Sequence, residues 1–324
     1  MAKILITGGA GYIGSVISNL ALQAGFEVLA VDLLWFKKDI PLAHLNNSSY
    51  RFLREDIAKI SKNLLKDIDY VIHTAAIVGE PASNKYPELT KRINQKASIS
   101  LINKCRQSNV KGFVFFSTCS NYGITDGTAT ENSPLKPLSL YAKTKVGVEN
   151  YLLENSKGLD WIICRLSTVY GVSPRMRFDL TVNDFALNAY LSKKLDVFLP
   201  YTYRPYIHVY DLAKSILLLI NDFKKVKNNI FNIGFNQENH QKIRIAEAIK
   251  KFIPGLEIKL TEKGSDLRNY KVDFTKMNEF LGIKNSFSVD DGVKQVINML
   301  ESGLINNPKE NFYYNTLPDL GDLN

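Results

Sequence analysis

The sequence has few cysteines and no long apolar run, and each absence excludes a class of protein. The only cysteines among 324 residues are Cys105, Cys119 and Cys164, too few and too scattered for a disulfide framework or a zinc site. No apolar stretch approaches the roughly 18 residues that a membrane span needs. The apolar start at residues 4–6 is too short for a secretion signal. We therefore expect a cytoplasmic protein with no bound metal and no membrane partner.

An excess of positive charge is present, but it is not concentrated. Lys and Arg number 41 against 32 Asp and Glu, which gives a formal net charge of +9. The longest cationic patches are pairs, such as Lys37-Lys38 and Lys250-Lys251, and nothing resembles the basic arm of a nucleic-acid-binding protein. We therefore predict no nucleic-acid partner and interpret most of the lysines as solvated surface.

Short apolar runs alternate with helical patterns along the first half of the chain. The runs that read as strands cover residues 3–7, 27–32, 51–54, 69–73, 112–117 and 161–165. Near-continuous Val, Ile and Leu in such strands predict a parallel sheet that is covered on both faces by the intervening helices. The pattern becomes irregular after Gly171, and the length corresponds to roughly two domains.

A glycine cluster follows the first predicted strand. Gly8, Gly11 and Gly14 recur every three residues before a predicted helix. In this context glycines let the backbone approach a pyrophosphate, and the helix N-terminus supplies free N–H groups. Asp32 ends the second predicted strand, where a carboxylate accepts hydrogen bonds from both ribose hydroxyls of NAD and repels the additional phosphate of NADP. Because no Arg follows Asp32, the pattern predicts NAD as the cofactor.

These observations together predict an α/β fold. We expect a Rossmann-like doubly wound parallel sheet with a smaller, discontinuous α/β substrate domain. Residues 1–171 and 205–236 are assigned to the NAD-binding domain, and residues 172–204 and 237–324 to the smaller domain.

A tyrosine and a lysine lie four residues apart on one predicted helix, at Tyr141 and Lys145, and therefore share a face. A free phenol titrates at about pH 10. A nearby ammonium and the positive nicotinamide ring would favour the phenolate and lower its pKa. The tyrosine could then take a proton from a sugar hydroxyl while a hydride leaves the same carbon. Thr118, at the end of the fifth predicted strand, could hold the same oxygen.

The order of these motifs resembles that of the extended short-chain dehydrogenase/reductase family, in particular its NAD-dependent nucleotide-sugar epimerases and dehydratases. The resemblance implies Tyr141 as the base, Lys145 as its electrostatic partner and Thr118 as the hydroxyl member. It implies a cofactor site made of Gly8, Gly11, Tyr12, Ile13, Gly14, Asp32, Asp56, Ile57, Ala75, Ala76, Ser117, Tyr141, Lys145 and Leu166. It also implies that a nucleotide-diphosphate sugar contacts Val78, Thr118, Asn121, Thr168, Arg175, Arg177, Asn183, Arg204 and Arg268. Arginine suits a diphosphate because its fork of donors matches phosphate oxygens.

Two local features narrow the expected reaction. The dehydratases of the family resemble Ser-Thr-Asp-Glu at the strand end, whereas Cys119 and Ser120 follow Thr118 here. The acid–base pair that removes water from C5 and C6 is therefore missing, which argues against 4,6-dehydration. Residues 172–185 resemble the corresponding loop of bacterial capsule enzymes that oxidise C4 of a GDP-linked manno-heptose. In that resemblance Arg175 and Arg177 line the substrate cleft.

The expected function is oxidation at C4 of a nucleotide-linked hexose or heptose to a 4-keto intermediate. This is the chemistry of a 4-dehydrogenase or 4-epimerase in surface-polysaccharide biosynthesis. The alternatives are a 4-keto-sugar reductase, a 4,6-dehydratase and, from another class, a non-catalytic NAD-binding regulator. Such regulators usually lose the Tyr/Lys pair, which is kept here. Because related enzymes pair through their helices, we expect a homodimer or homotetramer.

Overall fold

The computed structural model describes residues 1–36, 39–155, 157–264 and 266–316. Its largest element is a seven-stranded sheet in the order β11-β7-β5-β4-β1-β2-β3, in which every neighbouring pair is parallel. The strands are β1 (Lys3–Thr7), β2 (Glu27–Asp32), β3 (Tyr50–Arg54), β4 (Tyr70–His73), β5 (Gly112–Thr118), β7 (Trp161–Leu166) and β11 (Asn229–Ile233). The predicted doubly wound parallel sheet is confirmed.

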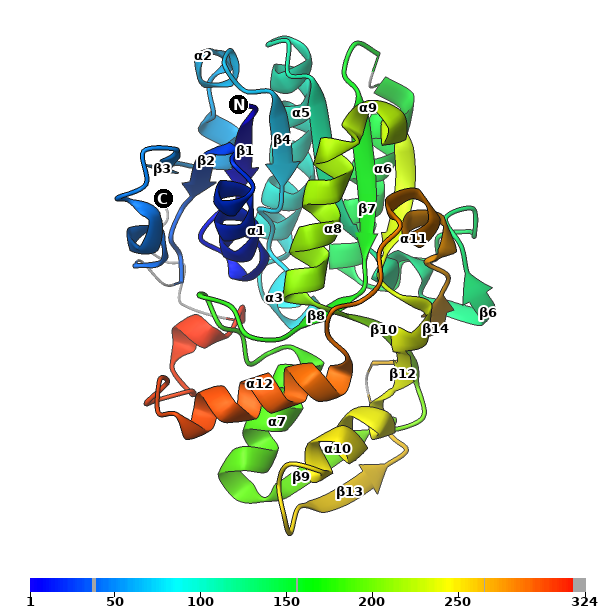
Figure 1. The fold of residues 1–324 in the computed structure, drawn as a ribbon. Coiled ribbons are helices and arrows are strands. Elements are labelled where there is room, and N and C mark those ends of the chain that lie inside the picture. Colours follow the sequence, from blue (N-terminus) through cyan, green and yellow to red (C-terminus); the bar gives the residue numbers. More distant parts are fainter. Residues whose placement is uncertain (37–38, 156, 265, 317–324) are drawn as a thin grey trace.

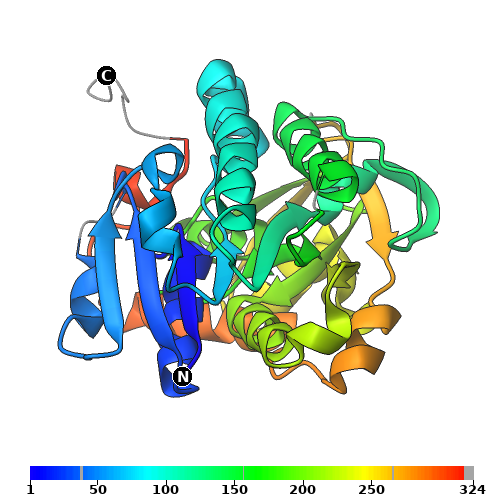
Figure 2. The ribbon, with the colours of Figure 1, turned by 90° about the horizontal axis from the view of Figure 1, so that it is seen from above.

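Helices cover both faces of this sheet (Figures 1 and 2). Ile4 and Ile6 of β1 belong to the core that includes α1 (Tyr12–Gln23) and α8 (Val209–Asn221). Leu5 belongs to the opposite core, with α5 (Ser98–Arg106) and α6 (Leu140–Asn155). Successive side chains of a strand point to opposite faces, so a strand that is buried on both sides is apolar throughout.

The chain reverses its strand order at β1. This strand pairs with β2 on one side and with β4 on the other, so the segments that follow β1 and β4 leave the same edge of the sheet side by side. A crevice forms at such a reversal point, outside the carboxyl ends of the strands, in open α/β sheets. The glycine loop after Thr7 lies at this point.

A smaller group of elements lies beneath the carboxyl ends of the strands (Figure 1). It contains α7 (Thr181–Ser192), α10 (Lys242–Lys250), α12 (Val289–Glu301) and a parallel pair of β9 (Lys194–Phe198) with β13 (Glu257–Thr261). A second small sheet joins β8 (Thr168–Tyr170), β10 (Tyr203–His208) and β12 (Asn239–Gln241), and a third joins β6 (Ile124–Ala129) to β14 (Asn269–Val272). One apolar core runs from α1 and α8 into α7 and α12 without a break. The domain boundaries proposed from the sequence stay a prediction.

The remaining elements are short. They are α2 (Lys62–Leu65), α3 (Glu80–Lys85), α4 (Pro87–Thr90), a π-helical stretch (Lys91–Ala97), α9 (Phe223–Val226), α11 (Thr275–Leu281) and 3₁₀ turns at Ile40–His44, Ile57–Lys59, Cys119–Tyr122, Asn236–Glu238 and Asn311–Tyr313. Over the described part of the chain, no helix has both the length and the apolar character that a bilayer crossing requires.

Candidate functional site: a dinucleotide cleft with a Tyr–Lys pair

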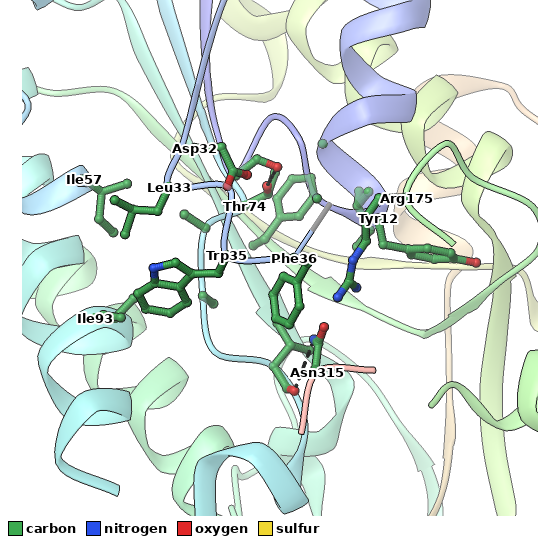
Figure 3. A pocket seen from close by; sticks show the side chains of 18 of the residues that line it. Tyr12, Asp32, Leu33, Trp35, Phe36, Ile57, Thr74, Ile93, Arg175 and Asn315 are labelled. Atoms are coloured by element: carbon green, nitrogen blue, oxygen red, sulfur yellow. Dashed lines mark hydrogen bonds between the residues drawn. The ribbon is translucent and has the colours of Figure 1, made fainter. Parts of the chain in front are cut away.

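A cleft opens at the reversal point of the sheet, and Figure 3 shows it from close by. Its volume, counting the open solvent at its mouth, is about 1070 Å³. All residues that the sequence predicted to bind the cofactor line it: Gly8, Gly11, Tyr12, Ile13, Gly14, Asp32, Asp56, Ile57, Ala75, Ala76, Ser117, Tyr141, Lys145 and Leu166. Segments that are far apart in the sequence are thus brought together on one surface.

The glycine loop packs too tightly for side chains. A Cβ on Gly14 would lie 2.1 Å from the carbonyl oxygen of Gly8, and a Cβ on Gly8, whose φ is +71°, would lie 2.9 Å from the amide nitrogen of Ala75. Glycine is the residue that tolerates such contacts and this φ. Gly11 is the N-cap residue of α1 and, because it has no side chain, makes no capping hydrogen bond to the first turn. The N–H groups of that turn are therefore available to a phosphate group.

Asp32, the predicted ribose-binding residue, lies in the cleft wall with two backbone hydrogen bonds. Its Oδ1 accepts a hydrogen bond from the amide of Leu34 at 2.8 Å, and its Oδ2 accepts one from the amide of Ala10 at 3.1 Å. Each carboxylate oxygen has a second lone pair that can accept a hydroxyl. Burial raises the pKa of Asp32, and these backbone hydrogen bonds oppose the shift.

The Tyr–Lys pair lies in the first two turns of α6. The Nζ atom of Lys145 lies 5.9 Å from the ring centre of Tyr141 and 4.9 Å from that of Phe115. Burial lowers the pKa of Lys145 to about 7. Burial also raises the pKa of Tyr141 to about 12, although the positive charges of Arg177 and Arg268 act in the opposite direction. In the protein alone, burial thus outweighs the cations, contrary to the expected lowering of the phenol pKa.

A buried polar network fixes the end of β5 against α6. Glu149 accepts hydrogen bonds from the hydroxyl of Ser117 and, at 2.9 Å, from Nδ2 of Asn121. It also forms an ion pair of 2.7 Å with Arg165 of β7. The network fixes Ser117, and the adjacent Thr118 lies close enough to Tyr141 to lower the pKa of its phenol. The role of Glu149 was not foreseen from the sequence.

Only some of the predicted substrate-binding residues lie at the cleft or next to it. Val78, Arg175 and Arg177 line it. Arg204 and Arg268 lie outside its lining and share one carboxylate, that of Asp266. Arg268 makes two hydrogen bonds to it, of 2.7 and 2.9 Å, and Nη2 of Arg204 lies 3.0 Å from it.

This arginine pair adjoins the end of β5, because Nη1 of Arg268 donates to Oγ of Ser120 at 3.2 Å. Thr118, also predicted to contact the substrate, lies two residues earlier at the same strand end. The arginine pair and Thr118 therefore belong to one region, next to Tyr141.

Three further predicted contacts are not brought to the cleft. Asn121 is fully buried in the Glu149 network. Asn183 is also fully buried; its Oδ1 accepts from the amide of Gly171 at 3.0 Å, and its Nδ2 donates to the carbonyl of Arg177 at 2.9 Å. Thr168 lies in β8, in register with Tyr206 of β10. The amide of Asn183 is occupied at both ends by the chain itself, whereas that of Asn121 donates to Ser117 and Glu149 through Nδ2 only.

Some residues of the cleft wall were missed. Trp35 and Phe36 follow β2, and Asn315 comes from the C-terminal segment (Figure 3). The backbone amide of Asn315 donates to Oδ2 of Asp179 at 2.9 Å, which holds the C-terminal segment at the cleft. The aromatic pair after Asp32 offered a signal in the sequence. Asn315 offered none, since nothing in a lone distant asparagine indicates where the tertiary fold will carry it.

The site combines a parallel sheet, a glycine loop, an acidic residue at the end of β2 and a Tyr–Lys pair. These features define a dinucleotide-binding α/β protein with an acid–base group at the cofactor. Residues 4–234 match the NAD dependent epimerase/dehydratase family. The chain belongs to this family of enzymes, and NAD is its cofactor.

Individual relatives resemble the chain over nearly its whole length. It is 30% identical to the UDP-glucose 4-epimerase of Lactobacillus helveticus, over 89% of this chain and 94% of the relative. The solved UDP-glucose 4-epimerase of Thermotoga maritima with UDP-glucose has a TM-score of 0.81 and 26% identity, over 94% of this chain and 100% of that one. UDP-glucuronic acid 4-epimerase from Bacillus cereus, in complex with UDP-glucuronic acid and NAD, has a TM-score of 0.80 and 26% identity, over 93% of this chain and 99% of that one.

Proposed function

We propose that the protein oxidises C4 of a nucleotide-diphosphate sugar to a 4-keto intermediate, as a 4-epimerase or 4-dehydrogenase. The observation that carries the proposal is the meeting of Tyr141, Lys145 and Thr118 where the dinucleotide cleft adjoins the Arg204–Arg268 pair. An acid–base group, an oxygen-binding hydroxyl and a diphosphate-binding surface are the parts that this chemistry needs. The similarity to two sugar-nucleotide 4-epimerases supports the choice of C4.

The chain's own groups perform the proton transfer. Tyr141 takes the proton of the C4 hydroxyl, while the hydroxyl of Thr118 holds the same oxygen. As the O–H bond breaks, a C=O bond forms and C4 loses its hydrogen with an electron pair, so the alcohol is oxidised by two electrons. NAD, when bound, supplies the acceptor for that hydride. Lys145 in its charged form stabilises the phenolate through space, and so do the nearby Arg177 and Arg268.

The outcome depends on the fate of the ketone. In an epimerase the sugar turns over and the hydride returns to the other face of C4. In a dehydrogenase the ketone leaves, and in a 4-keto reductase the same step runs backwards. Dehydration is disfavoured by the structure of the strand end. Cys119 is fully buried with its Sγ donating to the carbonyl of Arg165 at 3.2 Å, and burial raises its pKa well above the usual value.

The particular sugar is a further part of the proposal. Residues 172–185 resemble the loop of enzymes that act on a GDP-linked manno-heptose for capsule polysaccharide, whereas the relatives named above act on UDP-linked hexose derivatives. A panel of UDP-, GDP-, CDP- and dTDP-sugars incubated with the purified protein and NAD distinguishes them. Loss of two hydrogens from the sugar indicates oxidation, and altered stereochemistry at unchanged mass indicates epimerisation. Loss of water would contradict the proposal.

Tyr141→Phe tests the catalytic assignment. We expect turnover of the sugar to fall by about 10²- to 10⁴-fold, with NAD affinity close to that of the unmodified protein. Tyr151→Phe is the matched control, because Tyr151 is on the same helix but donates its hydroxyl to Asn103, away from the cleft. Unchanged turnover in Tyr141→Phe would rule out the phenol as the base.

A further inference from the structure

Arg175 is a buried cation that lacks acceptors for much of its guanidinium. The residue is only 3% exposed, and no residue in the described part of the chain accepts a hydrogen bond from its Nε or Nη2. Its neighbour Arg177 contrasts with it, because Asp179 binds Arg177 through two hydrogen bonds of 2.8 and 3.0 Å. Buried charges are normally paired, since removing them from water costs free energy. A missing anionic partner is therefore indicated at Arg175.

The guanidinium lies against an aromatic wall of the dinucleotide cleft. Its central carbon is 4.0 Å from the ring centre of Phe36, and Figure 3 shows it between Phe36 and Tyr12. Stacking on a ring satisfies the face of a guanidinium and leaves its N–H edge for another ligand. The positive charge of Arg175 also opposes the rise that burial causes in the pKa values of Asp32 and Tyr12. Arg175 therefore lies near the glycine loop.

The segment that carries Arg175 is tied directly to the glycine loop. The hydroxyl of Tyr12 donates to the carbonyl of Gly171 at 2.6 Å, and the hydroxyl of Ser173 donates to the carbonyl of Tyr12 at 2.7 Å. Asn183 fastens the same segment by its bonds to Gly171 and to the carbonyl of Arg177. Arg175 is therefore held in a fixed position relative to the N-terminus of α1.

We propose that Arg175 binds the pyrophosphate of NAD beside the glycine loop, so that the anion is held between the N–H groups of α1 and the Nε and Nη2 atoms of Arg175. The two arginine sets then serve two anions: Arg175 binds the cofactor, and the Arg204–Arg268 pair, outside the cleft lining, remains for the sugar nucleotide. Burial and the charge of Arg177 lower the pKa of Arg175 to about 9, and a bound pyrophosphate reverses this effect. The assignment rests on the NAD dependence of the family and not on which sugar is oxidised.

The test compares ligands that have and lack a diphosphate. Binding of NAD, ADP and adenosine to the full chain, freed of any bound dinucleotide, is measured by calorimetry for the unmodified protein and for Arg175→Gln. We expect NAD and ADP to bind roughly 10- to 100-fold more weakly to the variant, as expected for the loss of hydrogen bonds to a charged group, and adenosine to bind equally well. Arg106→Gln is the control, because Arg106 donates to Asn103 and Asn155 away from the cleft.

Other results would overturn the assignment. Unchanged NAD and ADP affinity in Arg175→Gln would do so, and so would an equal loss of adenosine affinity, which would mean that Arg175 only shapes the cleft. A loss confined to UDP or GDP, measured with NAD saturating, would assign Arg175 to the sugar nucleotide. If Arg175→Gln does not fold, Arg175→Lys and Phe36→Leu carry the same comparison, with a smaller loss expected for NAD and ADP only. Absence of sugar turnover with normal NAD binding would instead contradict the proposed function alone.

Discussion

Lys145 illustrates at the scale of one residue how a buried charge lowers stability. Burial lowers its pKa to about 7, against about 10.4 in an unfolded chain. Between these values the unfolded chain binds a proton that the folded chain does not, so the free energy of unfolding rises with pH across this window. Below about pH 7 both states are protonated and the full cost of burying the ammonium is present.

Lys145→Met should therefore stabilise the protein. At pH 7 we expect the free energy of unfolding to increase by roughly 2–4 kcal/mol, an advantage that shrinks as the pH approaches 10, while sugar turnover falls. Urea unfolding at pH 7 and pH 10 measures both values. A variant that is less stable than the original at pH 7 would show that hydrogen bonding of Lys145 outweighs its desolvation.

Gly14 gives a second prediction for a single residue. Because a Cβ there would meet the carbonyl oxygen of Gly8 at 2.1 Å, Gly14→Ala must displace the glycine loop. We expect NAD affinity to fall by on the order of tenfold or more, since the loop forms the pyrophosphate site. Gly127→Ala in β6 is the control, because its Cβ would meet nothing within 4 Å. Equal NAD affinity for the two variants would contradict this account.

At the scale of elements, α12 shows a signal that the sequence contained and our prediction missed. Ser288 accepts a hydrogen bond from the amide of Asp291, and the carboxylate of Asp291 accepts from the amide of Ser288 in return. This capping box starts an amphipathic helix in the part of the chain where the sequence pattern was interpreted only as irregular. Ser288→Ala should lower the free energy of unfolding by about 1 kcal/mol without changing NAD affinity, as chemical denaturation and calorimetry can measure.

Elements were predictable where the sequence pattern is local. The helix predicted to carry Tyr141 and Lys145 is α6, and the six predicted strands of the main sheet agree with the observed bounds to within one residue. The strands β6, β9, β13 and β14 were missed because they are not continuous apolar runs, and each pairs with a segment far away in the chain. Motifs at strand ends likewise predicted residues that line the cleft, whereas Asn183 and Asn121, predicted to contact the substrate, are buried and lie outside that lining. A buried asparagine that fastens loops has no local pattern that separates it from one that binds substrate.

At the scale of the whole molecule, the C-terminal segment returns to the first half of the chain. The carbonyl of Tyr313 accepts from the amide of Phe178, and its ring packs against that of Phe178 with centres 5.4 Å apart. Asn315 then forms part of the cleft wall. The cleft wall therefore contains residues from the start of the chain, such as Gly8, and from its C-terminal segment, such as Asn315.

Tyr313→Ala should loosen this part of the cleft wall. Because the aromatic contact that anchors Asn315 is lost, we expect NAD to dissociate several-fold faster, with a smaller change in its association rate. Stopped-flow displacement of bound NAD measures the rate. Tyr190→Ala removes an exposed ring on α7 and serves as the control. The same dissociation rate in both variants would show that the segment does not retain the cofactor.

The position of Trp35 also makes the redox state of the cofactor visible. The sequence has two tryptophans; Trp161 is buried in β7, whereas Trp35 lines the cleft. Indole emits light at wavelengths that a reduced nicotinamide absorbs, so excitation of Trp35 is passed on and re-emitted by the reduced cofactor. We expect this emission to decay rapidly if the hydride returns to the sugar and to persist if the ketone departs first. Trp35 would then report in real time which of the two proposed outcomes occurs.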